Sequence, residues 1–339
     1  MKIEVLAENL HHPWGMDFLP DGRLLVTERS GTLRIMGVQN AISEPIPGVP
    51  EVFAEGQGGL LDVAIDPDFE ENFFVYFSFS QPGAEGSAST ALGRGKLQNN
   101  EILDFQVLFS QIPKIEGPNH FGSRIVFHED YIFLTTGERY QFEPAQEKDN
   151  HLGKIIRLNK DGSVPSDNPF ADVQGSKNEI WTLGHRNMES AAIDPATGNL
   201  WIAEMGPKGG DELNLIKKGE NYGWPEVSWG NNYDGSKIPD PPTRAEFEDA
   251  VVHWTPVISP SGMDFYSGDL FPEWKGKMLI GGLSSKAMVI VEIKGEEAQE
   301  YERIDIGSRV RDVQQAPDGS IYLLTDEGNG KVLRISYFE

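Results

Sequence analysis

Cysteine is absent from the 339-residue sequence. This absence excludes disulfide bonds, thiolate metal sites and cysteine nucleophiles, but it does not assign a compartment. The sequence also has no long uninterrupted apolar segment, so we expect no transmembrane helix. Its N-terminus, residues 1–6, lacks the apolar region that a signal peptide requires. Either the protein is cytoplasmic, or the chain begins after a signal that has been removed.

Positive charge is scarce. Lys and Arg number 29 against 53 Asp and Glu, which gives a formal net charge of -24. Such a surface repels nucleic acids and anionic membranes, and we expect no nucleic-acid partner. The sequence also lacks a Walker loop, a Gly-x-Gly-x-x-Gly between a strand and a helix, and a Gly-x-Ser-x-Gly elbow. Nucleotide cofactors and serine hydrolase chemistry therefore have no motif to support them.

The sequence does contain a recurring pair of β-strands. Alternating apolar residues with β-branched and aromatic side chains dominate, and amphipathic helices are hard to find. Six strand–turn–strand units recur, at residues 16–19 and 23–27, 63–68 and 73–77, 124–127 and 131–134, 191–195 and 200–203, 263–266 and 277–280, and 313–316 and 321–324. Third strands follow several of them, such as 32–35, 154–158 and 331–335.

Six units over this length predict an all-β fold, a six-bladed β-propeller of four-stranded antiparallel blades. We expect the N-terminal strand, near residues 3–6, to close the last blade, since pairing the two ends of the chain removes an open sheet edge. Residues 1–339 would then form a single propeller domain. A pair of β-sandwiches is the alternative, which the six matching units disfavour.

Two residues of the third unit point to acid–base chemistry. His120 lies in a loop directly before the first strand, and Glu138 ends the next strand. In an antiparallel pair these positions lie at the same edge, so the imidazole and the carboxylate can meet. A carboxylate bound to one imidazole nitrogen fixes the tautomer and raises basicity. The alternative is an ordinary exposed histidine.

Polar and cationic residues recur at the corresponding places of the other units. They are Gln57 in the second unit, Arg186 and Asn187 in the fourth, Lys286 in the fifth, and Arg309 and Arg311 in the sixth. In so acidic a chain, cations gathered at one rim indicate an anion-binding site. The alternative is that these side chains form structural salt bridges.

A Gly/Pro-rich loop follows the fourth unit. Gly206 and Pro207 expose backbone carbonyls, and Asp211 and Glu212 add carboxylates. Carbonyls beside carboxylates are ligands that calcium prefers. An acidic surface turn is the alternative.

These motifs together resemble a known family, the soluble glucose/sorbosone dehydrogenases, and by length their aldose sugar dehydrogenase branch. The resemblance covers nearly the whole chain and rests on Gly56-Gln57-Gly58-Gly59-Leu60-Leu61, Asn119-His120, Gly184-His185-Arg186-Asn187, Gly206-Pro207, Asp211-Glu212-Leu213-Asn214, Asn221-Tyr222-Gly223-Trp224-Pro225 and Arg309-Val310-Arg311-Asp312-Val313. Family members are six-bladed propellers that use pyrroloquinoline quinone (PQQ) and calcium to oxidise aldoses. The resemblance therefore implies an oxidoreductase with an aldose substrate, PQQ and Ca2+ as cofactors, and an external electron acceptor.

The resemblance also implies roles for individual residues. His120 matches the general base that takes the proton of the anomeric hydroxyl while hydride passes to the quinone, and Glu138 stands where glucose enzymes of the family have an aspartate. Arg186 and Asn187 match quinone contacts, with Arg186 stabilising developing negative charge. The carbonyls of Gly206 and Pro207 match ligands of the active-site calcium. The other matched positions are Gln57 near cofactor and substrate, Lys286, Arg309 and Arg311 at the cofactor carboxylates, and Asp211 and Glu212 in a separate structural cation site.

Two further functions stay open at this point. One is a calcium-dependent sugar lactonase on a six-bladed propeller, and the other is a binding propeller without catalytic activity. The family resemblance favours a periplasmic or secreted protein, while a cytoplasmic one is not excluded. Sugar preference depends on the shapes of the loops at residues 140–148 and 221–244, which the sequence does not specify.

Overall fold

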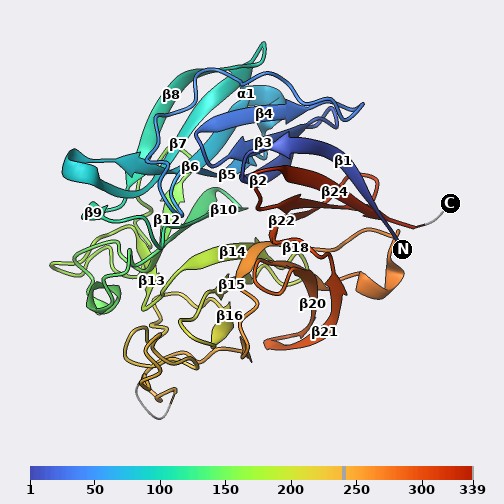
Figure 1. The fold of residues 1–339 in the computed structure, drawn as a ribbon. Helices are drawn as coiled ribbons and strands as arrows, with labels where there is room; N and C mark the ends of the chain where they lie inside the picture. Colours follow the sequence, from blue (N-terminus) through green and yellow to red (C-terminus); the bar gives the residue numbers. More distant parts are fainter. Residues whose placement is uncertain (239–241, 338–339) are drawn as a thin grey trace.

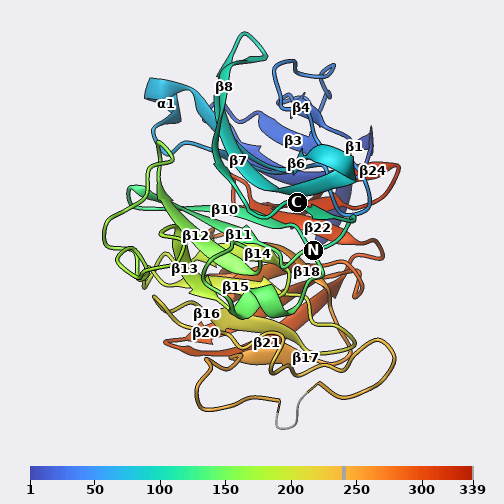
Figure 2. The ribbon, with the colours of Figure 1, turned by 90° about the vertical axis from the view of Figure 1, so that its left-hand side faces the viewer.

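The computed structural model describes residues 1–238 and 242–337. These residues form six antiparallel sheets that follow one another around a common centre, and the blue N-terminal strands lie beside the red C-terminal ones (Figure 1). The first strands of the six sheets, β2, β5, β10, β14, β18 and β22, contact one another in a closed ring. Four of them, β10, β14, β18 and β22, lie near the middle of the molecule in both views (Figure 1 and Figure 2). The all-β six-bladed propeller is confirmed.

The strands of the first three blades follow chain order. They are β2 (Pro13–Phe18), β3 (Leu24–Glu28) and β4 (Thr32–Met36) in blade 1; β5 (Leu60–Ile65), β6 (Phe74–Pro82), β7 (Ser87–Gln98) and β8 (Glu101–Ser110) in blade 2, where β9 (Ile115–Glu116) also pairs with β7; and β10 (Gly122–His128), β11 (Tyr131–Thr136), β12 (Lys154–Asn159) and β13 (Ile180–Leu183) in blade 3.

The remaining three blades repeat the pattern. They contain β14 (Met188–Ile193), β15 (Leu200–Glu204), β16 (Asp211–Leu215) and β17 (Val252–Trp254) in blade 4; β18 (Pro260–Phe265), β19 (Met278–Gly282), β20 (Ala287–Lys294) and β21 (Glu297–Asp305) in blade 5; and β22 (Val310–Gln315), β23 (Ile321–Thr325), β24 (Gly330–Ser336) and β1 (Lys2–Leu10) in blade 6. Short helical turns are α1 (Phe69–Asn72), η1 (Ala84–Gly86), η2 (Glu143–Gln146) and η3 (Pro272–Trp274).

The N-terminal strand closes the last blade, as predicted. β1 pairs with β24 and becomes the outer strand of blade 6, with Ile3 opposite Ile335. The described sheet has three strands in blade 1 and five in blade 2, where β9 is added to the usual four. In blade 1 the chain beyond β4 runs back along β4 irregularly: Met36 and Ile42 form a bridge, and the N–H groups of Ser43 and Ile46 donate to the carbonyl oxygens of Ile35 at 2.8 Å and Leu33 at 2.9 Å. Pro45, Pro47 and Pro50 interrupt this segment, because they lack the N–H that a regular fourth strand would donate.

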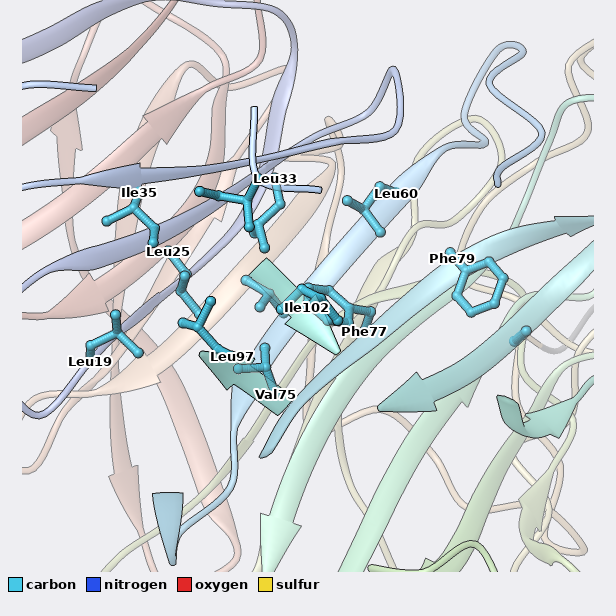
Figure 3. Close-up of a cluster of buried hydrophobic side chains, with 13 residues drawn as sticks. Leu19, Leu25, Leu33, Ile35, Leu60, Val75, Phe77, Phe79, Leu97 and Ile102 are labelled. Carbon is cyan, nitrogen blue, oxygen red and sulfur yellow. The ribbon is translucent and has the colours of Figure 1, made fainter. Parts of the chain in front are cut away.

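Each interface between neighbouring blades contains its own cluster of buried apolar side chains. Figure 3 shows the cluster between blades 1 and 2, where Leu25 and Leu33 face Val75 and Phe77. All four of these side chains are fully buried. Since both faces of a blade pack in this way, the loops at the strand ends are held by a rigid scaffold. In the part of the chain that the structure describes, no helix has the length and hydrophobicity needed to cross a membrane.

Candidate active site

His120 is held by its backbone before β10. It has a left-handed conformation with φ of 55°, and its N–H donates to Oε1 of Gln57 over 2.7 Å. Gly137 lies directly behind it, and a Cβ at Gly137 would come within 2.1 Å of the His120 carbonyl oxygen. Only glycine permits so close a backbone approach. Strained backbone of this kind clusters at functional sites.

His120 and Glu138 meet, as predicted from the strand pairing. Nδ1 of His120 lies 2.5 Å from Oε1 of Glu138, whose side chain is completely buried. The other carboxylate oxygen accepts the backbone N–H groups of Gln141 at 2.6 Å and Phe142 at 3.3 Å. A carboxylate accepts only, so Nδ1 must carry the hydrogen and Nε2 is left with a lone pair.

The surroundings of His120 favour a neutral imidazole. Burial is the main cause that lowers the pKa of His120, and the positive charge of Arg186 lowers it further, while the hydrogen bond to Glu138 opposes the shift. Nε2 forms no hydrogen bond with any described residue. The arrangement suits a base whose accepting nitrogen is open to a substrate hydroxyl.

Arg139 also supports this loop, a role that its sequence context does not indicate. It is fully buried and donates to the carbonyl oxygens of Gly117 at 2.6 Å, of Ile115 at 3.3 Å and of Asn119. Burial lowers the pKa of Arg139 to about 10. An arginine next to Glu138 in a polar loop has the sequence pattern of an exposed salt bridge, so only the structure shows that it binds three carbonyls.

Arg186 and Asn187 precede β14 and lie beside the end of β15. The Arg186 N–H donates to Glu204 at 2.7 Å, and its guanidinium binds the carbonyl oxygens of Met205 at 2.8 Å and Gly206 at 3.1 Å. Oδ1 of Asn187 accepts the N–H of Gly122 at 3.0 Å. The last bond connects blade 4 to the start of β10, two residues after His120.

Arg311 reaches this network from blade 6. Its buried guanidinium binds Glu189 on one side and Asp326 on the other, the latter at 2.6 Å. Glu189, whose role its sequence context also does not indicate, accepts Nδ2 of Asn187 at 3.0 Å. Arg309 is half exposed and lies 3.3 Å from Asp326. These ion pairs are structural salt bridges, the alternative to an anion-binding role for these side chains.

Two buried N–H groups of these arginines have no acceptor. Nε of Arg186 and Nε of Arg311 are buried without a hydrogen-bond partner in the described structure. An unpaired buried donor is unfavourable by about 1–3 kcal/mol, and a ligand acceptor would remove that penalty. Lys286 differs from these arginines, because it is exposed in the β19–β20 turn and its ammonium contacts no described side chain. No hydrogen bond or ion pair of a described residue therefore connects the Lys286 ammonium to the network.

The loop after β15 is folded tightly. A Cβ at Gly206 would lie 2.3 Å from the Gly210 carbonyl oxygen. Asp211 stabilises the fold of this loop, since its carboxylate accepts the N–H groups of Gly206 at 2.8 Å and Ser259 at 2.6 Å. Burial raises the pKa of Asp211 to about 6. Asp211 thus acts in the described structure as a backbone acceptor.

Glu212 faces a second carboxylate. It lies opposite Glu204 across β15 and β16, and burial together with the charge of Glu204 raises its pKa well above the usual value. A pocket beside the pair is lined by Arg186, Glu204, Gly206, Glu212, Tyr222 and Trp224. Among the described residues, no three His, Asp or Glu side chains are grouped so as to hold a metal ion. A cation here would need backbone carbonyls in addition to these carboxylates.

Comparison with known proteins identifies the family of the chain. The model of the family described as Glucose / Sorbosone dehydrogenase matches residues 10–334. The chain belongs to this family. This glucose/sorbosone dehydrogenase family member is 43% identical to aldose sugar dehydrogenase YliI of Escherichia coli, over 99% of this chain and 93% of the relative. The family resemblance seen in the sequence is confirmed.

Two solved structures of family members have the same fold. The soluble aldose sugar dehydrogenase of Escherichia coli in its apo-form superposes with a TM-score of 0.96 at 43% identity, over 99% of each chain. The PQQ-bound form of the aldose sugar dehydrogenase of Streptomyces coelicolor superposes with a TM-score of 0.80 at 27% identity, over 98% of each chain. The chain therefore has the architecture of an oxidoreductase family in which a quinone-bound member is known.

Proposed function

We propose that the protein is a quinoprotein aldose sugar dehydrogenase, which oxidises the anomeric hydroxyl of an aldose to a lactone. The observation that supports this most strongly is the His120–Glu138 pair, a buried neutral imidazole with its tautomer set and its Nε2 open. An alcohol oxidation needs such a base, because the hydroxyl proton must leave as the carbon is oxidised. Glu138 then stabilises the imidazolium that forms.

The residues present fit PQQ. Its carboxylates and quinone oxygens are acceptors, and the unpaired buried Nε groups of Arg186 and Arg311 are donors that need acceptors. Arg309, partly exposed beside them, and Asn187 would complete the set, with Gln57 at the His120 side. Lys286 would bind the quinone only if its ammonium moved toward the bound ligand. When bound, the quinone supplies the two-electron acceptor that no amino-acid side chain provides.

The carbonyl groups of Gly206 and Pro207 differ in how readily they could bind calcium. The Pro207 carbonyl accepts no hydrogen bond from the described residues, whereas the Gly206 carbonyl already accepts one from Arg186. A carbonyl oxygen has two lone pairs, so Gly206 can bind a cation as well. Glu212 is the better candidate of the acidic pair for a second cation, since both oxygens of Asp211 are already bound to backbone N–H groups. Calcium would supply Lewis-acid polarisation at the first position.

Arg186 and His120 have different roles in the proposed reaction. Arg186 is fixed at its backbone by Glu204, and its Cζ lies over the Trp224 ring at 5.2 Å from the centroid. Its positive charge would stabilise the negative charge that develops during the reaction. His120 accepts the proton at Nε2. We propose that electrons pass to an external acceptor and that the protein is periplasmic or secreted, which cell fractionation would test.

Reconstitution tests the function. Protein loaded with PQQ and CaCl2 should oxidise aldoses with an artificial dye as acceptor, and quinone binding is followed separately by absorbance. Arg309→Gln should weaken quinone binding, while Arg303→Gln, in an exposed pair with Glu300 on β21, should not. Saturable quinone binding without dye reduction across a broad aldose panel would contradict the proposal. Lactone hydrolysis without quinone would instead identify a lactonase.

A further inference from the structure

An aromatic wall extends from the base toward Arg186. The Tyr140 ring lies 5.3 Å from the His120 imidazole at an angle of 69°. Phe142 lies 5.1 Å from Tyr140, and Trp224 lies 5.7 Å from Phe142. Arg186 contacts the far end of the wall through Trp224. Ring contacts therefore connect the base to the cationic Arg186 without a break.

Tyr140 is the exposed end of this wall. Its side chain is 43% exposed, whereas His120 and Trp224 are each 5% exposed. No described charged side chain contacts its ring. An exposed aromatic ring against a buried base presents an apolar surface to a molecule that reaches the base from solvent.

The backbone holds Tyr140 in place at a cost. Tyr140 has φ of 62°, and Arg139 before it and Phe142 two residues after it have φ of 57° and 66°. A left-handed conformation is unfavourable by about 1–3 kcal/mol for residues other than glycine, and it persists where surrounding contacts enforce it. Those contacts are the bonds of Glu138 to the N–H groups of Gln141 and Phe142 and the carbonyl contacts of Arg139. The ring's position thus depends on the same residues that position His120.

We propose that Tyr140 is a specificity-determining residue that binds the C–H face of a pyranose ring. An aldopyranose has hydroxyls around its edge and C–H groups on its faces, so an aromatic face and a few polar groups recognise it together. With its ring on Tyr140, the sugar would direct its anomeric hydroxyl to Nε2 of His120. The inference rests on the proposed function and names cyclic, uncharged aldoses as the substrate class.

The test compares Tyr140→Ala and Tyr140→Phe with a matched control, Tyr301→Ala. Tyr301 is 48% exposed on the outer strand β21 of blade 5. In PQQ-loaded enzyme with D-glucose, Tyr140→Ala should raise KM roughly three- to tenfold, as expected for one lost aromatic contact, with little change in kcat. Tyr140→Phe keeps the ring and should restore KM, and Tyr301→Ala should match the wild type. The PQQ dissociation constant should be unchanged in all three.

Several outcomes would overturn the inference. These are an unchanged KM in Tyr140→Ala, a loss confined to kcat, a loss of PQQ affinity, or a failure of Tyr140→Phe to restore KM. Glucose binding to the PQQ-loaded proteins is also measured by calorimetry. If the wild type bound glucose without oxidising it, the proposed function would fail, and weaker binding by Tyr140→Ala alone would still support the aromatic platform.

Discussion

Blade 3 and blade 4 each place a buried histidine before their first strand and a glutamate near the end of their second, Glu138 two residues after β11 and Glu204 as the last residue of β15. In blade 3, Nδ1 of His120 lies 2.5 Å from Glu138. In blade 4, Nδ1 of His185 lies 3.0 Å from Glu204. Both histidines stand in a short loop that precedes the strand, and both pairs are shielded from solvent. By the carboxylate contact alone, either pair could be the base and its partner.

The two pairs differ in the surroundings of the second imidazole nitrogen, Nε2. Nε2 of His185 lies 2.9 Å from Thr182 Oγ1, and the ring stacks on Tyr222 with centroids 4.6 Å apart. His185 therefore has no nitrogen left for a substrate. Nε2 of His120 has no described partner, and the exposed Tyr140 lies beside the ring. A histidine–carboxylate pair marks an active site only when its other nitrogen can reach a ligand.

The largest expected effect is at His120. His120→Gln removes the base, and turnover should fall by roughly 10²- to 10⁴-fold while PQQ binding is kept. Steady-state dye reduction and absorbance titration of PQQ measure the two quantities. Near-wild-type turnover in this variant would show that His120 is not the base, and the proposed difference between the His120–Glu138 and His185–Glu204 pairs would fail.

Glu138→Gln should reduce turnover nearly as much, by roughly 10²-fold or more. The amide oxygen would accept the N–H groups of Gln141 and Phe142, so that the amide NH2 would face Nδ1 of His120. A donor there favours the tautomer protonated at Nε2, which cannot accept a proton. NMR of the imidazole nitrogens should show the changed tautomer, and an unchanged tautomer with full activity would argue against this role.

A moderate effect on kcat/KM is expected when the pH is lowered. The base is active when neutral, and the pKa of His120 is lowered from 6.5. Activity should therefore be constant near neutral pH and fall roughly tenfold per unit at lower pH, with a midpoint below 6.5. A profile measured with PQQ-saturated enzyme checks this, and a midpoint above 6.5 would contradict a buried, neutral His120.

The smallest effect on activity is expected at His185. His185→Gln removes hydrogen bonds to Glu204 and Thr182, and the free energy of unfolding should fall by about 1–3 kcal/mol. Turnover of the folded enzyme should change far less than in His120→Gln. Denaturant unfolding and kinetics on the same preparation test the difference. A large loss of turnover at unchanged stability would show that His185 has a more direct part.

Much of the site could be anticipated from strand pairing. The antiparallel rule brought His120 to Glu138, and the six repeated units placed Gln57, Arg186, Asn187 and Arg311 at corresponding strand starts. The structure connects these residues through bonds such as Asn187 to Gly122. Arg139 and Glu189 could not be found in this way, because a charge in a loop or strand has the same sequence pattern whether it is exposed or buried. Tyr140 lies in a loop whose shape no periodicity describes.

The sequence by itself determined the propeller, its closure by the N-terminal strand and the candidate base with its carboxylate. These follow from alternation, turn residues and pairing rules, which act over short stretches of chain. The tertiary structure decided which histidine keeps a free nitrogen, which arginines retain unpaired donors, and that blade 1 ends at three strands. Those outcomes depend on side chains from different blades that compete for the same hydrogen bonds, and such competition is settled only when the blades pack together.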